Sequence, residues 1–452
     1  MTRDRQLARE IAIKAARLGG KVYYVGGCVR DDILGRELKD VDIEVHGLPA
    51  NALEQILDTL GTRIEIGKSF GVYGLKGYTL DIAMPRKESA RGRGHRDFSV
   101  EVDPWVGTKE AARRRDFTIG ALMKEVLNGE IIDHFGGLED LKNGVLRHVD
   151  ANSFPEDPLR VLRAAQFAAR FNFTVAEETV SLCAAMDLST LSGERVAEEI
   201  KKALLYAKTP SRFFTVLRQM GQLKGWFDEL DALIGIPQNP VYHGEGDVWN
   251  HTMMVLDRAA GYRETAKHPY PFMLSALVHD FGKAATTTDK NGVLHAYDHE
   301  CAGVPMVRRF LNRFTKEKEL HNYVINMTEL HMQPGAAAGR GDSVKSTNRL
   351  FDRSKCPEDL ILLSLADNEG RIAERPQNPE SYLQERLEQY RQTMTAPFVS
   401  GKDLVEAGLH PNEQFHDILS YAHKLRLAGV GKEEALKQTL GYARQKQKKG
   451  KP

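Results

Sequence analysis

The pattern of hydrophobic and polar positions changes along the chain, from mixed in the first third to helical afterwards. Residues 1–18 carry an amphipathic helical pattern that stops at Gly19-Gly20. From Lys21 to about Gly137 short β-type runs dominate, with one helical stretch, NALEQILDTLG, between them. The β-type runs are KVYYVGG, VDIEVHG, YGLKGYTLDIAM and GEIIDHFGG. The pattern predicts a small α/β domain whose sheet is mixed or mostly antiparallel.

After SFPEDP the pattern is helical almost throughout, beginning with PLRVLRAAQFAARF. Breaks at KTPS, GIPQNPVYHGEG, KHPYP and QPGAAAGRGDS divide this helical part into subregions. The end of the chain, from Leu436 onwards, is basic and contains no acidic residue. Such a run is typical of a solvated, frayed chain end, and an RNA contact is the alternative.

Composition narrows the classes of protein. The chain has 452 residues, enough for two to four domains, with 41% hydrophobic and 28% charged residues. Its net charge is +1, so any nucleic-acid contact must come from local basic patches. The four cysteines form no CxxC pair, which indicates a reducing compartment. Neither an apolar signal segment nor a run of 18 apolar residues occurs, so we expect a cytoplasmic protein without a membrane span.

The first candidate site lies in YYVGGCVRDDILGRELKDVDIEVHG, residues 23–47. Gly26 and Gly27 can take positive φ and let the backbone approach a phosphate. Arg30 follows, and its planar guanidinium suits phosphate oxygens. Asp40 and Asp42 are two apart in a strand pattern and so point to one face, where two carboxylates suit Mg²⁺ shared with substrate phosphates. A glycine turn followed by solvated aspartates is the alternative.

Two neighbouring segments extend this prediction. Asp81, in the strand-like run YTLDIAMPRK, is a candidate third carboxylate, and an exposed strand acid is the alternative. Residues 86–115 form a basic patch that contains the glycine-rich stretch ESARGRGHRDFSVEVDPWVG. Its composition predicts a mobile loop.

The stretch EDPLRVLRAAQFAAR carries Asp157, Arg160 and Arg163 at intervals of three, which predicts one side of a helix. Asp157 can accept from an exocyclic amine while Arg160 donates to a ring nitrogen or carbonyl, so the pair can imitate a complementary base. Cytosine and adenine both carry such an amine, whereas uracil and guanine do not match. An i,i+3 salt bridge on a solvated helix is the alternative.

A second candidate site lies in the helical part, where imidazoles and carboxylates recur in the order typical of a divalent-metal site. The short motifs are GDVWNHTMMVLDRA, SALVHDFGKA, AYDHECAG, TELHMQPG and LSLADNEGR. The residues concerned are His251, His279, Asp280, His299, His331 and Asp367.

The first set of motifs resembles the class II tRNA nucleotidyltransferase (CCA-adding enzyme)/poly(A) polymerase family of the DNA polymerase β-like superfamily. RRRDFTIGALM (113–123), EDPLRVLRAAQFAARF (156–171) and GKSFGVYGL (67–75) extend the match, which covers residues 20–225. The resemblance implies Mg²⁺ and catalysis at Asp40, Asp42 and Asp81. It also implies nucleotide binding by a set of residues that contains Gly26, Gly27, Arg30, Arg115, Asp116, Asp157, Arg160 and Arg163.

Two positions depart from the family pattern. Gly120 stands where an asparagine is usual, and Gln166 stands where many members have an arginine. Gln166 keeps a hydrogen-bond donor but lacks the positive charge that an arginine would carry at this position.

The helical motifs resemble the HD phosphohydrolase superfamily. The resemblance implies that His251, His279, Asp280 and Asp367 bind a divalent metal of unspecified identity, with His299 and His331 as candidate ligands of a second metal. Some family members use this domain on 2′,3′-cyclic phosphates or phosphorylated ends, which fits RNA end repair. The sequence leaves open whether the domain is active.

Together the resemblances imply an α+β fold, with a nucleotidyltransferase head on a mixed β-sheet and an all-α body that includes an HD domain. The expected domains are the head (1–145), a helical nucleotide-selecting and RNA-binding neck (146–225), the HD domain (226–375) and a helical C-terminal region with a basic tail (376–452).

The expected function is template-independent addition of CCA to the 3′ end of tRNA from CTP and ATP. The loop within residues 86–115 favours full CCA addition, because a family loop there helps to switch from C to A. CC-only or A-only addition and poly(A) polymerase remain alternatives. A metal-dependent phosphohydrolase with an RNA-binding head and a non-catalytic RNA-binding protein are alternatives from other classes.

Overall fold

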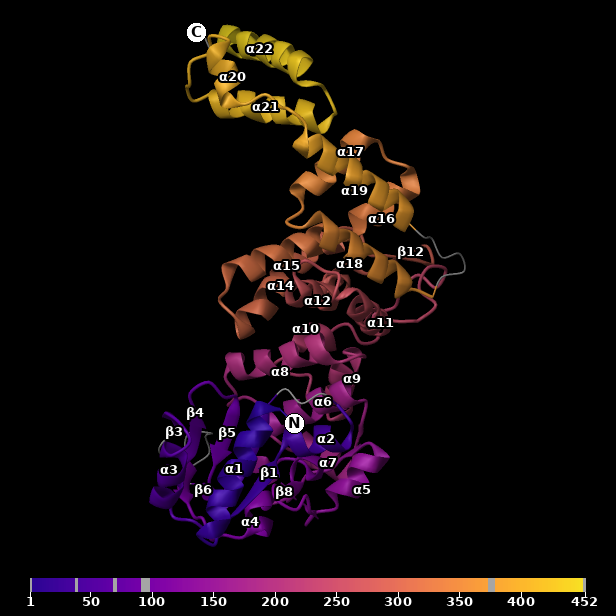
Figure 1. The fold of residues 1–452 in the computed structure, drawn as a ribbon. Coiled ribbons are helices and arrows are strands. Elements are labelled where there is room, and N and C mark those ends of the chain that lie inside the picture. Colours follow the sequence, from indigo (N-terminus) through magenta and orange to yellow (C-terminus); the bar gives the residue numbers. More distant parts are fainter. Residues whose placement is uncertain (1, 37–39, 68–70, 91–97, 373–378, 450–452) are drawn as a thin grey trace. The chain divides into compact units, whose positions relative to one another are not determined.

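The computed structural model describes residues 2–36, 40–67, 71–90, 98–372 and 379–449 (Figure 1). The chain divides into two compact units. Unit 1 comprises Met1–Ala203 and Arg212–Gly225, and unit 2 comprises Leu204–Ser211 and Trp226–Pro452. The finer division into four domains remains a prediction.

Unit 1 contains a seven-stranded sheet in the order β3-β4-β5-β2-β1-β8-β9. Within it β2 and β5 are parallel, and the other neighbouring strands are antiparallel. This confirms the predicted mixed sheet. The elements are α1 (Arg3–Arg17), β1 (Lys21–Val25), α2 (Gly27–Ile33), β2 (Val41–His46), α3 (Ala50–Asp58), β3 (Arg63–Gly67), β4 (Val72–Leu75), β5 (Leu80–Ala83), β6 (Arg86–Ala90), β7 (Phe98–Val102), α4 (Thr108–Arg113), β8 (Met123–Glu125), β9 (Ile131–Ile132), α5 (Gly137–Asn143), β10 (Val145–Leu146), α6 (Leu159–Phe171), β11 (Thr174–Val175) and α7 (Glu177–Ala184).

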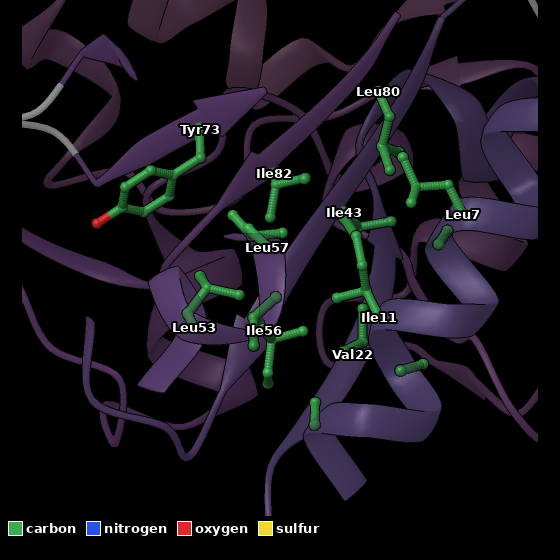
Figure 2. Packing of buried hydrophobic residues seen from close by; sticks show 14 of the residues in the cluster. Leu7, Ile11, Val22, Ile43, Leu53, Ile56, Leu57, Tyr73, Leu80 and Ile82 are labelled. Atoms are coloured by element: carbon green, nitrogen blue, oxygen red, sulfur yellow. The ribbon is translucent and has the colours of Figure 1, made fainter. Parts of the chain in front are cut away.

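The main core of this unit forms where α1 and α3 pack against one face of the sheet (Figure 2). Leu7 and Ile11 recur at helical spacing on α1, and Leu53 and Leu57 do the same on α3. They meet side chains such as Ile43 of β2. Because successive side chains of a strand point to opposite faces, the alternation of β2 leaves its acidic residues on the face away from this core.

The segment expected to be a mobile loop is partly regular structure, so that prediction is wrong for its described ends. β6 and β7 pair antiparallel, with Arg86 opposite Val102 and Ala90 opposite Phe98. The backbone hydrogen bonds of this strand pair order both flanks. Residues 91–97 lie outside the described residues, as do residues 68–70 of the motif GKSFGVYGL.

The rest of the chain is helical apart from one short strand pair, which agrees with the prediction of helix almost throughout. Two helices begin or end in the short segment assigned to unit 2, namely α8 (Gly193–Tyr206) and α9 (Ser211–Gln219). The remaining elements are α10 (Asp228–Asp231), α11 (Val248–Tyr262), α12 (Pro269–Val278), α13 (Lys283–Thr286), β12 (Thr288–Lys290), β13 (Val293–His295), α14 (His299–Phe314), α15 (Lys318–Leu330), α16 (Met332–Arg340), α17 (Val344–Arg353), α18 (Pro357–Glu369), α19 (Glu380–Thr395), α20 (Gly401–Glu406), α21 (Phe415–Leu427) and α22 (Lys432–Lys449). In the described part of the chain, every helix is too short or too polar to cross a bilayer.

Candidate functional site

A cavity of about 510 Å³ in unit 1 gathers most of the residues predicted for the nucleotide site. Its lining combines cationic side chains with carboxylates, which suits a triphosphate together with a cation. The lining includes Gly26, Gly27, Arg30, Arg36, Asp40, Asp42, Arg115, Asp116, Gly120, Arg163, Gln166, Phe167, Arg170 and Lys202.

The glycine turn brings the backbone close to the guanidinium group of Arg115. Gly26 has φ +70°, and a Cβ atom there would lie 2.9 Å from Nη1 of Arg115. A side chain is therefore excluded both by the positive φ and by the space. The turn ends β1 and starts α2, so Arg30 follows on the first turns of that helix and reaches the same cavity.

The three predicted carboxylates lie on or near the adjoining parallel strands β2 and β5. Asp42 is opposite Asp81 in the strand register, and Asp40 immediately precedes β2. Burial raises the pKa of Asp42, and the charges of Asp81 and Asp40 raise it further, while Arg115 opposes the shift. A divalent cation would relieve this accumulated negative charge, so the residues fit Mg²⁺. Asp40 and Asp42 line the cavity, and Asp81 is not among its lining residues.

A buried glutamate supports the arginines of the RRRD motif. Glu44, on the same face of β2 as Asp42, is 1% exposed, and its Oε2 atom accepts a hydrogen bond from Arg114 at 3.1 Å. The Nε2 atom of His46 lies 2.8 Å from the other carboxylate oxygen, and Arg115 lies 3.8 Å from Oε2. Burial opposes ionisation, but His46, Arg115 and Arg114 lower the pKa of Glu44 to about 2. Sequence analysis missed this residue, although its i+2 spacing from Asp42 was a signal.

Two further arginines are fixed in orientation around the cavity. Arg30 donates two hydrogen bonds to Asp31, and its guanidinium lies 4.3 Å from the ring centroid of Phe171. Arg163 donates to Asp116 at 2.6 Å. The arginine-aspartate motif and helix α6 therefore meet at the cavity, as the sequence indicated.

Asp157 does not have the predicted helical geometry, whereas Arg160 lies in α6 as predicted. Helix α6 begins at Leu159, and Asp157 is extended (φ −119°, ψ 102°) because it precedes Pro158. The proposed shared helix face is therefore wrong for Asp157. Its carboxylate pairs with Arg195 at 3.0 Å.

Arg160 likewise has other partners. It donates to the carbonyl oxygens of Ser153 at 2.8 Å and Arg114 at 2.9 Å. Neither the base-like pair nor the alternative Asp157–Arg160 salt bridge is formed, and neither residue is among those lining the cavity. Their role in reading a base stays a prediction.

The face of α6 toward the cavity is made of Arg163, Gln166, Phe167 and Arg170. Gln166 is 1% exposed, and its Nε2 atom is buried without a hydrogen-bond partner among the described residues. A buried amide that lacks a partner costs free energy unless a ligand supplies the acceptor. Gln166 and Gly120, the two positions at which the chain departs from the family pattern, thus both lie at the cavity.

The second cluster is built in unit 2 from five helical segments. His251 lies in α11, His279 and Asp280 follow α12, and Asp367 lies in α18. His299 begins α14, and His331 joins α15 to α16. All six residues are buried, with exposed fractions of 4% or less.

Asp280 is the centre of this cluster. Its Oδ2 atom lies 3.3 Å from Nε2 of His279 and 3.5 Å from Nε2 of His251. Its Oδ1 atom lies 3.1 Å from Nε2 of His299 and 3.6 Å from Nε2 of His331. Ligand atoms of His251, His279 and Asp367 lie within 4.8 Å of one another, and so do those of Asp280, His299 and His331. The arrangement offers two adjoining metal positions with Asp280 between them.

Each of the four imidazoles is held through its Nδ1 atom, which leaves Nε2 for a ligand. The partners of Nδ1 are Glu245 for His251, at 2.9 Å, and carbonyl oxygens for the others. These are Ala276 for His279, Ala296 for His299 and Thr328 for His331, at 2.7–2.9 Å. Such bonds fix the ring orientation of metal-binding histidines.

The buried polar atoms also fit a metal. Nε2 of His279 and both carboxylate oxygens of Asp280 are buried without a hydrogen-bond partner among the described residues. Burial opposes ionisation of Asp280, but Lys283 and His279 hold its pKa well below the usual range. The pKa of Asp367 is likewise held low by Arg371 and His251 against the effect of burial. Ionised carboxylates and imidazole nitrogens are suitable ligands for a divalent transition metal.

Three supporting residues of this cluster were missed by sequence analysis. Glu245 bonds both His243 and His251, Lys283 lies 2.7 Å from Asp280, and Arg371 pairs with Asp367. Lys283 lies within the motif SALVHDFGKA and Arg371 ends the motif LSLADNEGR, so both stood beside the predicted ligands. Glu245 had no comparable signal, because its contact with His251 depends on the loop before α11.

The mixed sheet, its carboxylates and the arginine-lined cavity define the head of a nucleotidyltransferase. The family model of the poly A polymerase head domain matches residues 22–147 of the chain. The family model of a probable RNA and SrmB-binding site of polymerase A matches residues 172–234. The multifunctional CCA protein of Nitrosococcus oceani is 37% identical over 400 residues, which cover 86% of this chain and 93% of the relative. That of Pasteurella multocida is 37% identical over 364 residues, covering 78% and 84%. The chain belongs to the family of multifunctional CCA proteins, and it is an enzyme.

Solved structures show the same fold. The Thermotoga maritima CCA-adding enzyme complexed with tRNA has a TM-score of 0.64 at 21% identity, covering 97% of this chain and 95% of that one. The Bacillus stearothermophilus CCA-adding enzyme in complex with CTP has a TM-score of 0.67 at 21% identity, covering 99% and 100%. The predicted family and fold class are therefore confirmed.

Proposed function

We propose that this protein adds C, C and A to the 3′ end of tRNA, using CTP and ATP and releasing pyrophosphate. The observation that carries the proposal is the cavity in which the Gly26 turn, Arg115 and Asp42 meet. Membership in the multifunctional CCA protein family supplies the class of substrate. A tRNA substrate implies that the protein works in the cytoplasm.

The residues of the cavity divide into two groups by chemistry. Arg30, Arg115 and Arg163 bind triphosphate oxygens, and Gly26 allows the backbone to approach them. Asp40 and Asp42 would hold Mg²⁺, with Asp81 as the adjacent carboxylate. When bound there, Mg²⁺ neutralises phosphate charge and favours ionisation of a bound hydroxyl. The RNA 3′ oxygen forms a bond to the α-phosphorus while the bond to the β-phosphate oxygen breaks, and pyrophosphate leaves.

The test is incubation with tRNA that lacks its 3′ end and with labelled CTP and ATP. We expect two C residues and then one A, after which addition stops. A run of A residues would favour poly(A) polymerase, and a stop after two C residues or addition of A alone would favour a partial enzyme. Absence of incorporation with retained hydrolysis would favour the phosphohydrolase with an RNA-binding head.

We also propose that the histidine-aspartate cluster is a metal-dependent phosphohydrolase that acts on phosphorylated or 2′,3′-cyclic phosphate ends of RNA. Four Nε2 atoms directed at a buried carboxylate without hydrogen-bond partners support this proposal. His251, His279, Asp280 and Asp367 would hold one metal, and His299 and His331, sharing Asp280, would hold a second. Metals bound there activate water and polarise the phosphoryl group. Elemental analysis of purified protein, together with hydrolysis of a cyclic phosphate before and after chelation, tests the proposal.

A further inference from the structure

A cavity of about 340 Å³ lies next to the histidine cluster, and its chemistry favours an anionic ligand that carries an aromatic group. His299 and His243 belong to its lining, and so do Lys283 and Arg371. Its described lining residues include two strong cations and no carboxylate. Lys283 forms an ion pair with Asp280 at 2.7 Å and donates a hydrogen bond to Gln238 at 2.8 Å, so at least one of its three donors is left for a ligand.

The rim of the same cavity is aromatic and exposed. Tyr242 is 60% exposed and Tyr297 is 61% exposed, which is unusual for rings of this size in one place. The ring of Tyr297 is stacked on His295 with centroids 4.8 Å apart and an interplanar angle of 12°. Flat, exposed rings beside phosphate-binding groups are the elements that hold a nucleobase in single-stranded RNA sites.

A second cavity, of about 540 Å³, adjoins the first, because Met332 lines both. On this side α17 places Lys345, Arg349 and Arg353 at intervals of four residues, all exposed and all lining the cavity. Residues spaced by four lie along one face of a helix. Among the described residues these three cations have no ion-pair partner, whereas the neighbouring Arg340 pairs with Asp342. Three such cations in a row match the successive phosphates of an RNA backbone.

We propose that the two cavities together bind the end of an RNA chain, with the terminal base against Tyr242 and Tyr297 and the preceding phosphates along Lys345, Arg349 and Arg353. The inference rests on the proposed phosphohydrolase function and names its substrate as a chain end rather than a free nucleotide. The terminal phosphate then lies between Lys283 and the histidine cluster.

Hydrolysis kinetics on three probes separate the parts of the proposal. The probes are adenosine 2′,3′-cyclic phosphate, an octaribonucleotide with a 2′,3′-cyclic phosphate end, and glycerol 2-phosphate, which has no base. Tyr242→Ala with Tyr297→Ala should raise KM for both nucleotide probes by about 5- to 100-fold and leave KM for glycerol 2-phosphate unchanged. Tyr297→Phe with Tyr242→Phe keeps the aromatic rings and should retain the original KM values for both nucleotide probes.

The row of cations on α17, namely Lys345, Arg349 and Arg353, is tested with a charge-matched control. Lys345→Ala, Arg349→Ala and Arg353→Ala together should raise KM for the octaribonucleotide only. They should also reduce the slope of log affinity against log salt by about 2, as expected for three lost phosphate contacts. The control carries Arg308→Ala, Lys316→Ala and Lys318→Ala, which remove three exposed cations of α14, α15 and their connection that line neither cavity. It should leave both quantities unchanged.

Photocrosslinking gives a readout independent of turnover. An octaribonucleotide with a 3′-terminal 5-iodouridine should crosslink to peptides that contain Tyr242 or Tyr297, and the yield should fall in the alanine pair. Unchanged KM in that pair, or crosslinks confined to unit 1, would overturn the base site. If KM for the octaribonucleotide is unchanged in the variant that lacks Lys345, Arg349 and Arg353, the proposal that an RNA chain binds along these residues is overturned. Absence of metal and of turnover with the expected crosslinks would instead reject the hydrolase function.

Discussion

Asp42 of β2 stands opposite Asp81 of β5 in the parallel register of the head sheet, and burial together with this neighbour raises the pKa of Asp42. Asp42 lies at the wall of an arginine-lined cavity, and Asp81 lies beside it on the neighbouring strand, although the mutual repulsion of two carboxylates disfavours this arrangement. The Mg²⁺ proposed above would relieve this repulsion, because it would bind these carboxylates together with the substrate phosphates.

The first prediction concerns this metal position. Asp42→Ala should reduce nucleotide incorporation at least about 1,000-fold, because it removes a carboxylate that would hold the metal against the triphosphate. Incorporation of labelled CTP and ATP into tRNA is the measurement. Hydrolysis at the histidine cluster of the same variant is the control and should be unchanged, since the two sites lie in different compact units. Full incorporation by Asp42→Ala would refute the assignment, and Asp40→Ala should behave in the same way.

The second prediction concerns the histidine cluster. His279→Ala with Asp280→Ala should reduce bound metal and abolish cyclic phosphodiesterase and phosphatase activity, because Asp280 lies between the two proposed metal positions. Elemental analysis and hydrolysis assays measure the two effects, and CCA addition should be spared. His410→Ala, an exposed histidine of the same unit, serves as the control. Hydrolysis retained by the double variant would place the hydrolytic centre elsewhere.

The third prediction concerns Gln166, whose buried Nε2 atom has no hydrogen-bond partner in the described part of the chain. Gln166→Arg should tighten triphosphate binding, since a charge-assisted hydrogen bond contributes about 1.5–3 kcal/mol when buried and less when exposed. Gln166→Ala should weaken binding if the amide donates to the substrate. Nucleotide affinity measured by titration decides the matter. Equal affinities for all three proteins would mean that this side chain does not contact the nucleotide.

The fourth prediction concerns Asp157 and its partner Arg195. If Asp157 reads the base, Asp157→Ala should weaken discrimination against UTP and GTP by about 1–3 kcal/mol. The measurement is kcat/KM for all four triphosphates on one tRNA. Arg195→Ala removes the observed ion pair and leaves the carboxylate, so it serves as a matched comparison. An equal fall for all four triphosphates in Asp157→Ala would identify a structural role instead.

The fifth prediction concerns the stability of unit 1 in acid. Burial opposes ionisation of Glu44, but His46 and two arginines lower its pKa from 4.5 to about 2. A lowered pKa in the folded state stabilises the fold above the unfolded value, and that stability is lost as the pH falls from about 4.5 to 2. Glu44→Gln should therefore reduce the free energy of unfolding by about 3 kcal/mol at pH 7 and by much less near pH 2. Denaturant unfolding at several pH values measures this difference, and a loss independent of pH would contradict it.

Much of the head could be predicted from the sequence because its signals are local. A glycine pair after a strand, alternating apolar and acidic positions in β2, and helical spacing in α1 each follow from backbone geometry. The histidine motifs could be recognised for a similar reason, since HD and the flanking histidines are each short. Chemistry carried by neighbouring residues is readable without knowledge of the fold.

Tertiary structure decided what depends on residues far apart in the chain. Arg195 pairs with Asp157 and Glu245 supports His251 through loop and helix placements that local spacing does not encode. The same holds for Tyr242 and Tyr297, which meet at one cavity although 55 positions separate them. Pro158 is by contrast a local signal: Asp157 lies outside the helix that its spacing had predicted, because a proline disfavours helical backbone at the residue before it. The sequence determined which chemical groups are present, whereas the packing of the helices and strands determined which of them touch, since contact is set by long-range burial rather than by spacing.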